Sequence, residues 1–96
     1  MPIYEWDEAK RAQNLAKHKV DFSAVRGMDW RQAISDPQFR EGETRFITVG
    51  PIGDRLHCLI WTWRDENVRV ISLRKANSRE ERAYDIATQE TDQPDP

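Results

Sequence analysis

Cysteine, glycine and long apolar runs are scarce in this chain of 96 residues, and each shortage excludes a class of protein. The single cysteine, Cys58, cannot form an internal disulfide, which excludes a disulfide-stapled secreted domain and fits a reducing compartment. No apolar run approaches the roughly 18 residues of a membrane span, so we expect no membrane partner. Together these features predict a cytoplasmic protein without a secretory signal.

Two kinds of site also lack their usual residues. No cysteine–histidine cluster has metal-ligand spacing, and none of the four glycines belongs to a glycine-rich loop able to cradle a nucleotide. We therefore expect neither a metal nor a cofactor. The chain also lacks a net positive charge, because its 15 basic and 17 acidic residues give a net charge of −2. This net charge argues against a general nucleic-acid coat protein.

The length is enough for one domain with a modest core, to which four tryptophans bring large apolar areas. Residues 90–96 hold three acids, two prolines and no base, a composition typical of a disordered acidic tail. We predict a single domain over residues 1–89, followed by this tail.

The N-terminal third predicts one short strand and two helices. Residues 2–6 read as an edge strand, and Asp7 is the expected N-cap of a helix that ends near His18. A second helix is expected from Asp21 or Ser23 to about residue 34, or two short pieces divided at Gly27, closed by a turn at residues 36–37. The inward stripe of the first helix is expected on Trp6, Ala9, Ala12, Leu15 and Ala16.

From Thr44 the hydrophobic period changes to two, which predicts strands over residues 44–50, 55–63 and 68–74. Short turns between them predict a three-stranded antiparallel meander. Ser78 and Glu81 have the spacing of a capping box for a final helix, with an apolar stripe on Ala83, Ile86 and Ala87. The order of elements predicts an α+β domain.

The segment from residue 68 to residue 84 concentrates positive charge at a strand end and the following helix start. Its five basic residues face only two acids, Glu80 and Glu81. Guanidinium forks suit phosphate, and a strand–helix junction is rigid enough to aim them. The segment therefore predicts a phosphate or RNA site formed by Arg69, Arg74, Lys75, Arg79 and Arg82.

Several short stretches carry a pattern that extends over most of the chain. They are residues 4–10, 14–18, 20–22, 42–43, 45–46, 69–76, 79–80, and single residues Gly50, Arg82 and Tyr84. Taken in order, these stretches resemble the BrnT family of bacterial toxins, the partners of BrnA antitoxins in type II toxin–antitoxin modules. The resemblance covers residues 4–84 and implies a RelE-like fold: an N-terminal strand and two helices, the three-stranded meander and a C-terminal helix. It departs at Lys19, where family members often carry a glycine that caps the helix.

Membership implies a growth-inhibiting endoribonuclease that cleaves RNA and blocks translation, and that a BrnA-like antitoxin neutralises. It also implies a toxin–antitoxin heterotetramer that binds operator DNA. Cleavage without a metal needs a base for the 2′-hydroxyl, cations for the phosphorane and an acid for the leaving 5′-oxygen. The catalytic candidates are the phosphate-holding Arg45, Arg74 and Arg79 and the acid/base groups His18, Glu43 and Tyr84; Lys75, Arg82 and Arg69 are candidates for RNA binding.

Each candidate also has a purely structural interpretation. Arg74 could pair with Glu43 or Glu80, Glu43 with Arg45 across strands, and Tyr84 could be a core residue with its hydroxyl at the rim. His57 and Cys58 are expected in the core, together with at least one of Trp61 and Trp63. The alternative function is a catalytically inactive module that binds an antitoxin and contributes to operator DNA binding. A stand-alone RNA-binding or regulatory domain is a third hypothesis.

Overall fold

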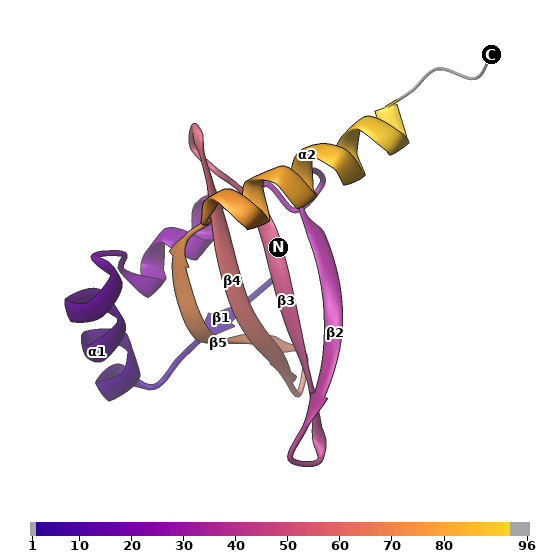
Figure 1. The fold of residues 1–96 in the computed structure, drawn as a ribbon. Helices are drawn as coiled ribbons and strands as arrows, with labels where there is room; N and C mark the ends of the chain where they lie inside the picture. The colour runs from indigo at the N-terminus through magenta and orange to yellow at the C-terminus, as the bar shows by residue number, and fades with distance from the viewer. Residues whose placement is uncertain (1, 93–96) are drawn as a thin grey trace.

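A mixed five-stranded sheet organises the molecule, and the computed structural model describes residues 2–92 (Figure 1). The strand order is β1-β5-β4-β3-β2, with β1 parallel to β5 and every other neighbouring pair antiparallel. The α+β prediction is confirmed, but the antiparallel meander has four strands, because β2 precedes the three that the sequence predicted. The strands are β1 (Tyr4–Glu5), β2 (Ile34–Arg40), β3 (Glu43–Ile52), β4 (Arg55–Arg64) and β5 (Asn67–Lys75).

Three helical elements flank the sheet: α1 (Glu8–His18), the short 3-10 helix η1 (Phe22–Gly27) and α2 (Ser78–Asp92). In Figure 1, α2 crosses the front of β4, β3 and β2, whereas α1 stands beside the β5 edge, away from α2. Within residues 2–92, no helix is both long and apolar enough to cross a bilayer. Helix α2 continues to Asp92, and residues 93–96 of the predicted tail lie outside the described residues.

The predicted bounds of α1 are confirmed by its two caps. The Asp7 carboxylate accepts the N–H groups of Ala9 and Lys10 at 2.8 and 3.1 Å, and the helix ends at Lys19 in a left-handed conformation with φ 61°. The predicted inward stripe is wrong, because its alanines and Leu15 are exposed and only Trp6 packs against the core. The residue that α1 buries is polar, Asn14, which binds the backbone of the adjoining strand.

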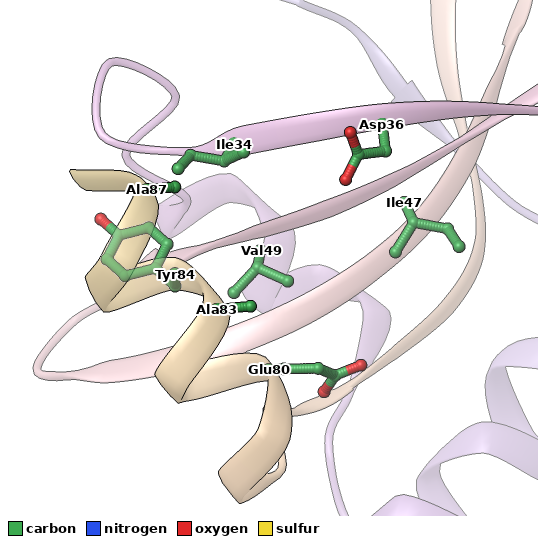
Figure 2. Close-up of a pocket in the computed structure, with 8 residues that line it drawn as sticks. All are labelled: Ile34, Asp36, Ile47, Val49, Glu80, Ala83, Tyr84 and Ala87. Carbon is green, nitrogen blue, oxygen red and sulfur yellow. The ribbon is translucent and has the colours of Figure 1, made fainter. Parts of the chain in front are cut away.

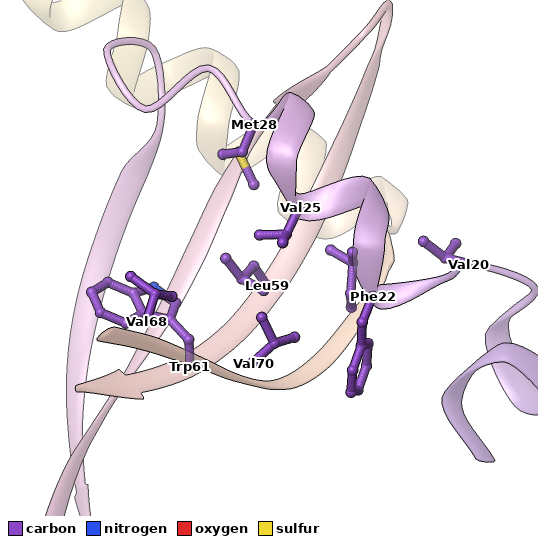
Figure 3. Close-up of a cluster of buried hydrophobic side chains, with 9 residues drawn as sticks. Val20, Phe22, Val25, Met28, Leu59, Trp61, Val68 and Val70 are labelled. Atoms are coloured by element: carbon purple, nitrogen blue, oxygen red, sulfur yellow. The ribbon is translucent and has the colours of Figure 1, made fainter. Parts of the chain in front are cut away.

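The core lies between η1 and one face of the sheet (Figure 3). Phe22 and Val25 are fully buried against side chains of β4 and β5 such as Leu59 and Val70. The predicted second helix is therefore mostly wrong: two turns of 3-10 helix end at Gly27, the predicted point of division. Short, tightly packed elements of this kind contain too few residues to produce helical periodicity.

The largest correction is strand β2. The predicted turn at residues 36–37 lies inside it, because the actual turn is Glu41–Gly42, where both residues have positive φ (51° and 81°) and Arg40 pairs with Glu43. This two-residue geometry is the kind that matches the twist of a hairpin. The strand left no alternating pattern because all its residues after Ile34 are exposed. Pro37 is tolerated there because β2 is an edge strand.

The cap of α2 lies one residue earlier than predicted. The Asn77 side chain accepts the N–H of Glu80 at 2.9 Å, and the Glu80 carboxylate accepts the N–H of Asn77 at 2.9 Å. This reciprocal pair is a capping box, so the prediction of Ser78 with Glu81 is wrong by one position. The face of α2 turned to the sheet includes Ala83 and Ala87, whereas the predicted stripe residue Ile86 is 59% exposed.

Candidate nucleic-acid interface

Three arginines share the sheet face opposite the core. Thr62 of β4 pairs with Arg45 of β3 on one side and with Arg69 of β5 on the other. Farther along β4, Cys58 pairs with Arg74. Directly opposed residues in antiparallel strands project to the same side, and Cys58 and Thr62 are an even number of residues apart. We call the surface formed by Arg45, Arg69 and Arg74 the arginine face.

A β-bulge makes this arrangement possible. Ile60 pairs with Ser72 but Trp61 pairs with Val70, so Ile71 is an extra residue in β5. Without the bulge, Arg69 and Arg74 would point to opposite faces, because they are five residues apart. Strict alternation along β5 would put both Ser72 and Val70 on the side of Arg74. Ser72 does lie on that side, but Val70 is buried in the core because the bulge separates it from Ser72.

Two of the three arginines are engaged by carboxylates. Arg69 donates to Glu5 at 2.6 Å, and Arg74 donates to both oxygens of Glu80 at 2.7 and 2.8 Å. The Arg74 guanidinium lowers the pKa of Glu80 from its ordinary 4.5 to about 2. Hydrogen bonds from Asn67 and then Arg69 lower the pKa of Glu5. The alternative pairing of Arg74 with Glu80 is thus present in the structure.

Arg45 is held less firmly than the other two. Its guanidinium lies 4.0 Å from the carboxylate of Glu43, at the outer limit of an ion pair. Within residues 2–92, its Nε is buried and has no hydrogen-bond partner. Glu43 and Arg45, two apart on β3, face the same side, so their ion pair runs along one strand rather than across two. Of the three guanidinium groups, Arg45 has the most unused hydrogen-bonding capacity.

Helix α2 covers the far end of this face and leaves a cleft beneath it (Figure 2). The cleft has a volume of about 360 Å³. Tyr84 lines it and donates its hydroxyl to the Gln32 carbonyl at 2.7 Å. Tyr84 therefore lines this cleft outside the core cluster, and its hydroxyl is directed toward the β2 side rather than toward the arginines. The lining residues are Ile34, Asp36, Ile47, Val49, Glu80, Ala83, Tyr84 and Ala87.

His18 lies at the opposite border of the same face. It lines a pocket between α1 and β5 together with Ser72, which pairs with Ile60 between the rows of Arg69 and Arg74. Lys10 and Lys17 line the same pocket. Sequence reasoning missed these two lysines, although their spacing of seven residues puts them on one side of a helix and was a usable signal.

The remaining candidates do not join this face. Lys75 pairs with His57, which places it on the core side of the sheet. Arg79 and Arg82 are exposed on α2 and do not line the cleft. The structure therefore brings together Arg45, Arg69, Arg74 and Glu43, with His18 at one edge and Tyr84 at the other.

The predicted core positions of His57, Cys58 and one of the two tryptophans of β4 are confirmed. His57 is 8% exposed with Nδ1 2.9 Å from the Arg55 carbonyl, and Trp61 is buried while Trp63 is 53% exposed. Cys58 is buried, and desolvation raises the pKa of its thiol to about 11, which makes it a poor nucleophile. Within residues 2–92, no group of three or more histidine, cysteine, aspartate or glutamate side chains could hold a metal ion.

Comparison with known protein families gives a match over most of the chain. The model of the family described as "Ribonuclease toxin, BrnT, of type II toxin-antitoxin system" matches residues 6–80. The chain belongs to the BrnT family. The matched range includes the whole sheet except β1 and ends at Glu80, in the first turn of α2. The arginine face thus lies inside the part of the chain shared with BrnT proteins, and most of α2 lies beyond it.

A solved BrnT structure supports the same assignment. The chain is similar to the ribonuclease toxin BrnT of Brucella abortus, known from a crystal structure at 1.1 Å resolution, with 26% identity and a TM-score of 0.67. The alignment covers 81% of this chain and 100% of that chain. A comparison with curated protein sequences gave no match.

Proposed function

We propose that this chain is an active, metal-independent endoribonuclease toxin whose catalytic surface is the arginine face. The observation that carries the proposal is the row Arg45–Thr62–Arg69 together with Arg74, which lies opposite Cys58 farther along the same side. The three guanidinium groups are partly exposed on the side of the sheet opposite the core. Family membership supports RNA as the substrate. Guanidinium groups hold phosphate oxygens through paired hydrogen bonds and supply the positive charge that a phosphorane requires.

In the proposed reaction, the 2′-hydroxyl attacks the adjacent phosphorus, the bond to the 5′-oxygen breaks, and a 2′,3′-cyclic phosphate remains. Arg45 stabilises the phosphorane, because its guanidinium is partly exposed and its carboxylate neighbour, Glu43, lies 4.0 Å away. Glu43 takes the 2′-hydroxyl proton, since its carboxylate lies 4.0 Å from the same guanidinium. His18 and Tyr84, at the two edges of the face, are the candidates for protonating the 5′-oxygen, and Tyr84 would first have to release its hydrogen bond to the Gln32 carbonyl. Arg79 is exposed on α2 and would contact RNA beyond the cleavage point.

The cellular role follows from the family. A type II toxin has an antitoxin partner, so we propose neutralisation by a BrnA-like protein in a heterotetramer that binds operator DNA. We further propose that the unneutralised chain acts in the cytoplasm, where cleavage of RNA blocks translation and growth.

One observation favours the alternative, a catalytically inactive binding module. Arg69 and Arg74 are already bound by Glu5 and Glu80, so two of the three guanidinium groups are occupied within the chain itself. In that case the face would serve antitoxin contact, and purified protein would leave RNA intact.

The test is cleavage of single-stranded RNA by purified, antitoxin-free protein in a chelator, over about pH 6 to 9, which covers the range where such acids and bases operate. We expect fragments that end in a cyclic phosphate. Arg45→Ala should slow cleavage by about 100- to 1,000-fold, as removal of one transition-state donor does elsewhere. The matched control is Arg31→Ala, an exposed arginine outside the face. Intact RNA from folded wild-type protein would establish the binding module instead.

His18→Gln and Tyr84→Phe separate the two acid candidates. Loss of the proton donor should slow cleavage of an ordinary RNA much more than that of a substrate whose leaving group needs no proton. The variant that shows this difference identifies the acid.

A further inference from the structure

A polar pocket of about 250 Å³ lies between α1 and β5, beside the arginine face. Two lysines, Lys10 and Lys17, and one histidine, His18, line it, and none of its lining residues is acidic. This α1–β5 pocket is completed by Gln13, Asn14, Ile71 and Ser72.

The pocket is held by a rigid junction. The buried side chain of Asn14 donates to the carbonyls of Leu73 and Val20 at 2.7 and 3.0 Å, and accepts the N–H of Leu73 at 3.3 Å. These bonds fix α1 against the free edge of β5, where the bulge residue Ile71 lies. Because Lys10 and Lys17 are seven residues apart, both side chains extend from one side of the helix, from Cα atoms separated by roughly 10 Å along the axis.

The positive charge of the pocket is not neutralised by its own helix. Glu8 pairs with Arg11, and Asp21 binds the same arginine at 2.8 and 2.9 Å. The carboxylate of Asp7 is used in capping the helix. Within residues 2–92, neither Lys10 nor Lys17 forms an ion pair with a carboxylate.

The pocket is continuous with the arginine face through Ser72. Its neighbour across the sheet is Ile60, and the rows on either side contain Arg69 and Arg74. A nucleic-acid strand that contacts the arginines can therefore pass directly over Ser72 to the α1 border. Proteins that bind single-stranded RNA follow its backbone with such a continuous line of cationic groups.

We propose that the α1–β5 pocket binds a backbone phosphate of the RNA strand, at a nucleotide flanking the one whose phosphodiester lies at Arg45. This inference rests on the proposed function for the identity of the ligand as RNA. Lys10 and Lys17 supply point charges to the phosphate oxygens, and the Ser72 hydroxyl donates a hydrogen bond. Lys10, Lys17 and Ser72 thus set the position of the strand on the sheet rather than taking part in bond cleavage.

The test measures binding of a single-stranded RNA with 2′-O-methyl riboses, which lacks the attacking hydroxyl and stays intact. Lys10→Gln/Lys17→Gln should weaken binding at least tenfold at low salt. The slope of log affinity against log salt should become shallower by roughly 0.7 for each phosphate that the protein no longer neutralises. The matched control is Lys19→Gln/Arg31→Gln, which removes the same charge from exposed residues outside the pocket. Equal affinity and slope in the two double variants would overturn the inference.

A second measurement identifies the ligand. Inorganic phosphate and the 2′-O-methyl RNA are titrated while the imidazole resonances of His18 and His57 are followed by NMR. RNA should shift His18, in the pocket, while His57, buried on the other face, should not move. Saturation by inorganic phosphate at lower concentration than by RNA would show a free-anion site and overturn the inference.

The two proposals fail in different ways. RNA binding that depends on the lysines, without cleavage of ordinary RNA, would reject the ribonuclease proposal and support the pocket. Cleavage with no specific effect of the lysines would support the ribonuclease and reject the pocket.

Discussion

The carboxylate of Glu80 joins the sheet to the last helix by binding Arg74 and Asn77 at once. It accepts two hydrogen bonds from the Arg74 guanidinium, at 2.7 and 2.8 Å, and one from the Asn77 backbone N–H at 2.9 Å. The arginine at the end of β5 is thus tied to the first turn of α2 by one ionised group.

This junction predicts a specific acid sensitivity. The pKa of Glu80 is lowered from 4.5 to about 2, so its contribution to stability is complete above about pH 4.5 and is lost as the pH falls toward 2. Glu80→Gln should lower the free energy of unfolding at neutral pH by about 1–2 kcal/mol, allowing for solvent screening. This difference between the wild type and the variant, the stability gap, should disappear in acid. Urea unfolding at several pH values measures the gap. A constant gap, like that expected for the exposed control Glu66→Gln, would contradict the prediction.

Asn14 is expected to contribute more to stability than any other polar residue of α1. Asn14→Ala leaves the N–H and carbonyl of Leu73 without their side-chain partners in a buried place, at a cost of about 2–4 kcal/mol. Gln13→Ala, on the exposed part of the same helix, should change stability by less than about 0.5 kcal/mol. Chemical denaturation compares the two, and similar costs would show that the amide contacts are unimportant.

The left-handed helix end at Lys19 offers a stabilising substitution. Lys19 has φ 61°, a conformation that glycine adopts without strain, so Lys19→Gly should raise the free energy of unfolding by about 0.5–1 kcal/mol. Lys19→Ala is the control, because both variants lose the bond from Nζ to the Ala16 carbonyl but only glycine relieves the backbone. Thermal unfolding should rank glycine above alanine, and the reverse order would contradict the strain argument.

Gly50 is expected to tolerate no side chain. A Cβ there would lie 2.7 Å from Cβ of Ala33 and 2.7 Å from the sulfur of Met28, so Gly50→Ala should cost about 1–3 kcal/mol through overpacking. At Gly27 the nearest contact would be a methyl group of Ile52 at 3.3 Å, which makes Gly27→Ala the milder control. Equal melting temperatures for the two variants would show that the loop at Ala33 moves aside.

Much of the fold was predictable because local chemistry determined it. The cap at Asp7, the end of α1 near His18 and the three period-two strands follow from short-range rules that the structure obeys. Strand β2 was not predictable in this way. Its residues after Ile34 are exposed, so alternation of burial, the signal used for strands, does not exist there.

The chemistry of the candidate site was predictable, and its geometry was not. Arginines near a strand end suggested phosphate contact, but the common face of Arg69 and Arg74 depends on the register between β4 and β5. Alternation counted back from Arg74 along β5 puts Val70 on the arginine side, although it lies in the core. The bulge that causes this difference has no local sequence signature here. Lys10 and Lys17 were overlooked since their partner surface, at Ser72, is far away in the sequence.

The extra residue Ile71 has a consequence for comparing sequences within the family. Removing it would leave Val68 through Arg74 in strict alternation, with Val70 and Leu73 still buried and Arg69, Ser72 and Arg74 still outward. A relative one residue shorter at this point would thus keep both surfaces of the sheet, because β5 would then alternate without a bulge. Deletion of residue 71 therefore leaves the direction of the other β5 side chains unchanged. An alignment gap at this position is compatible with the same fold.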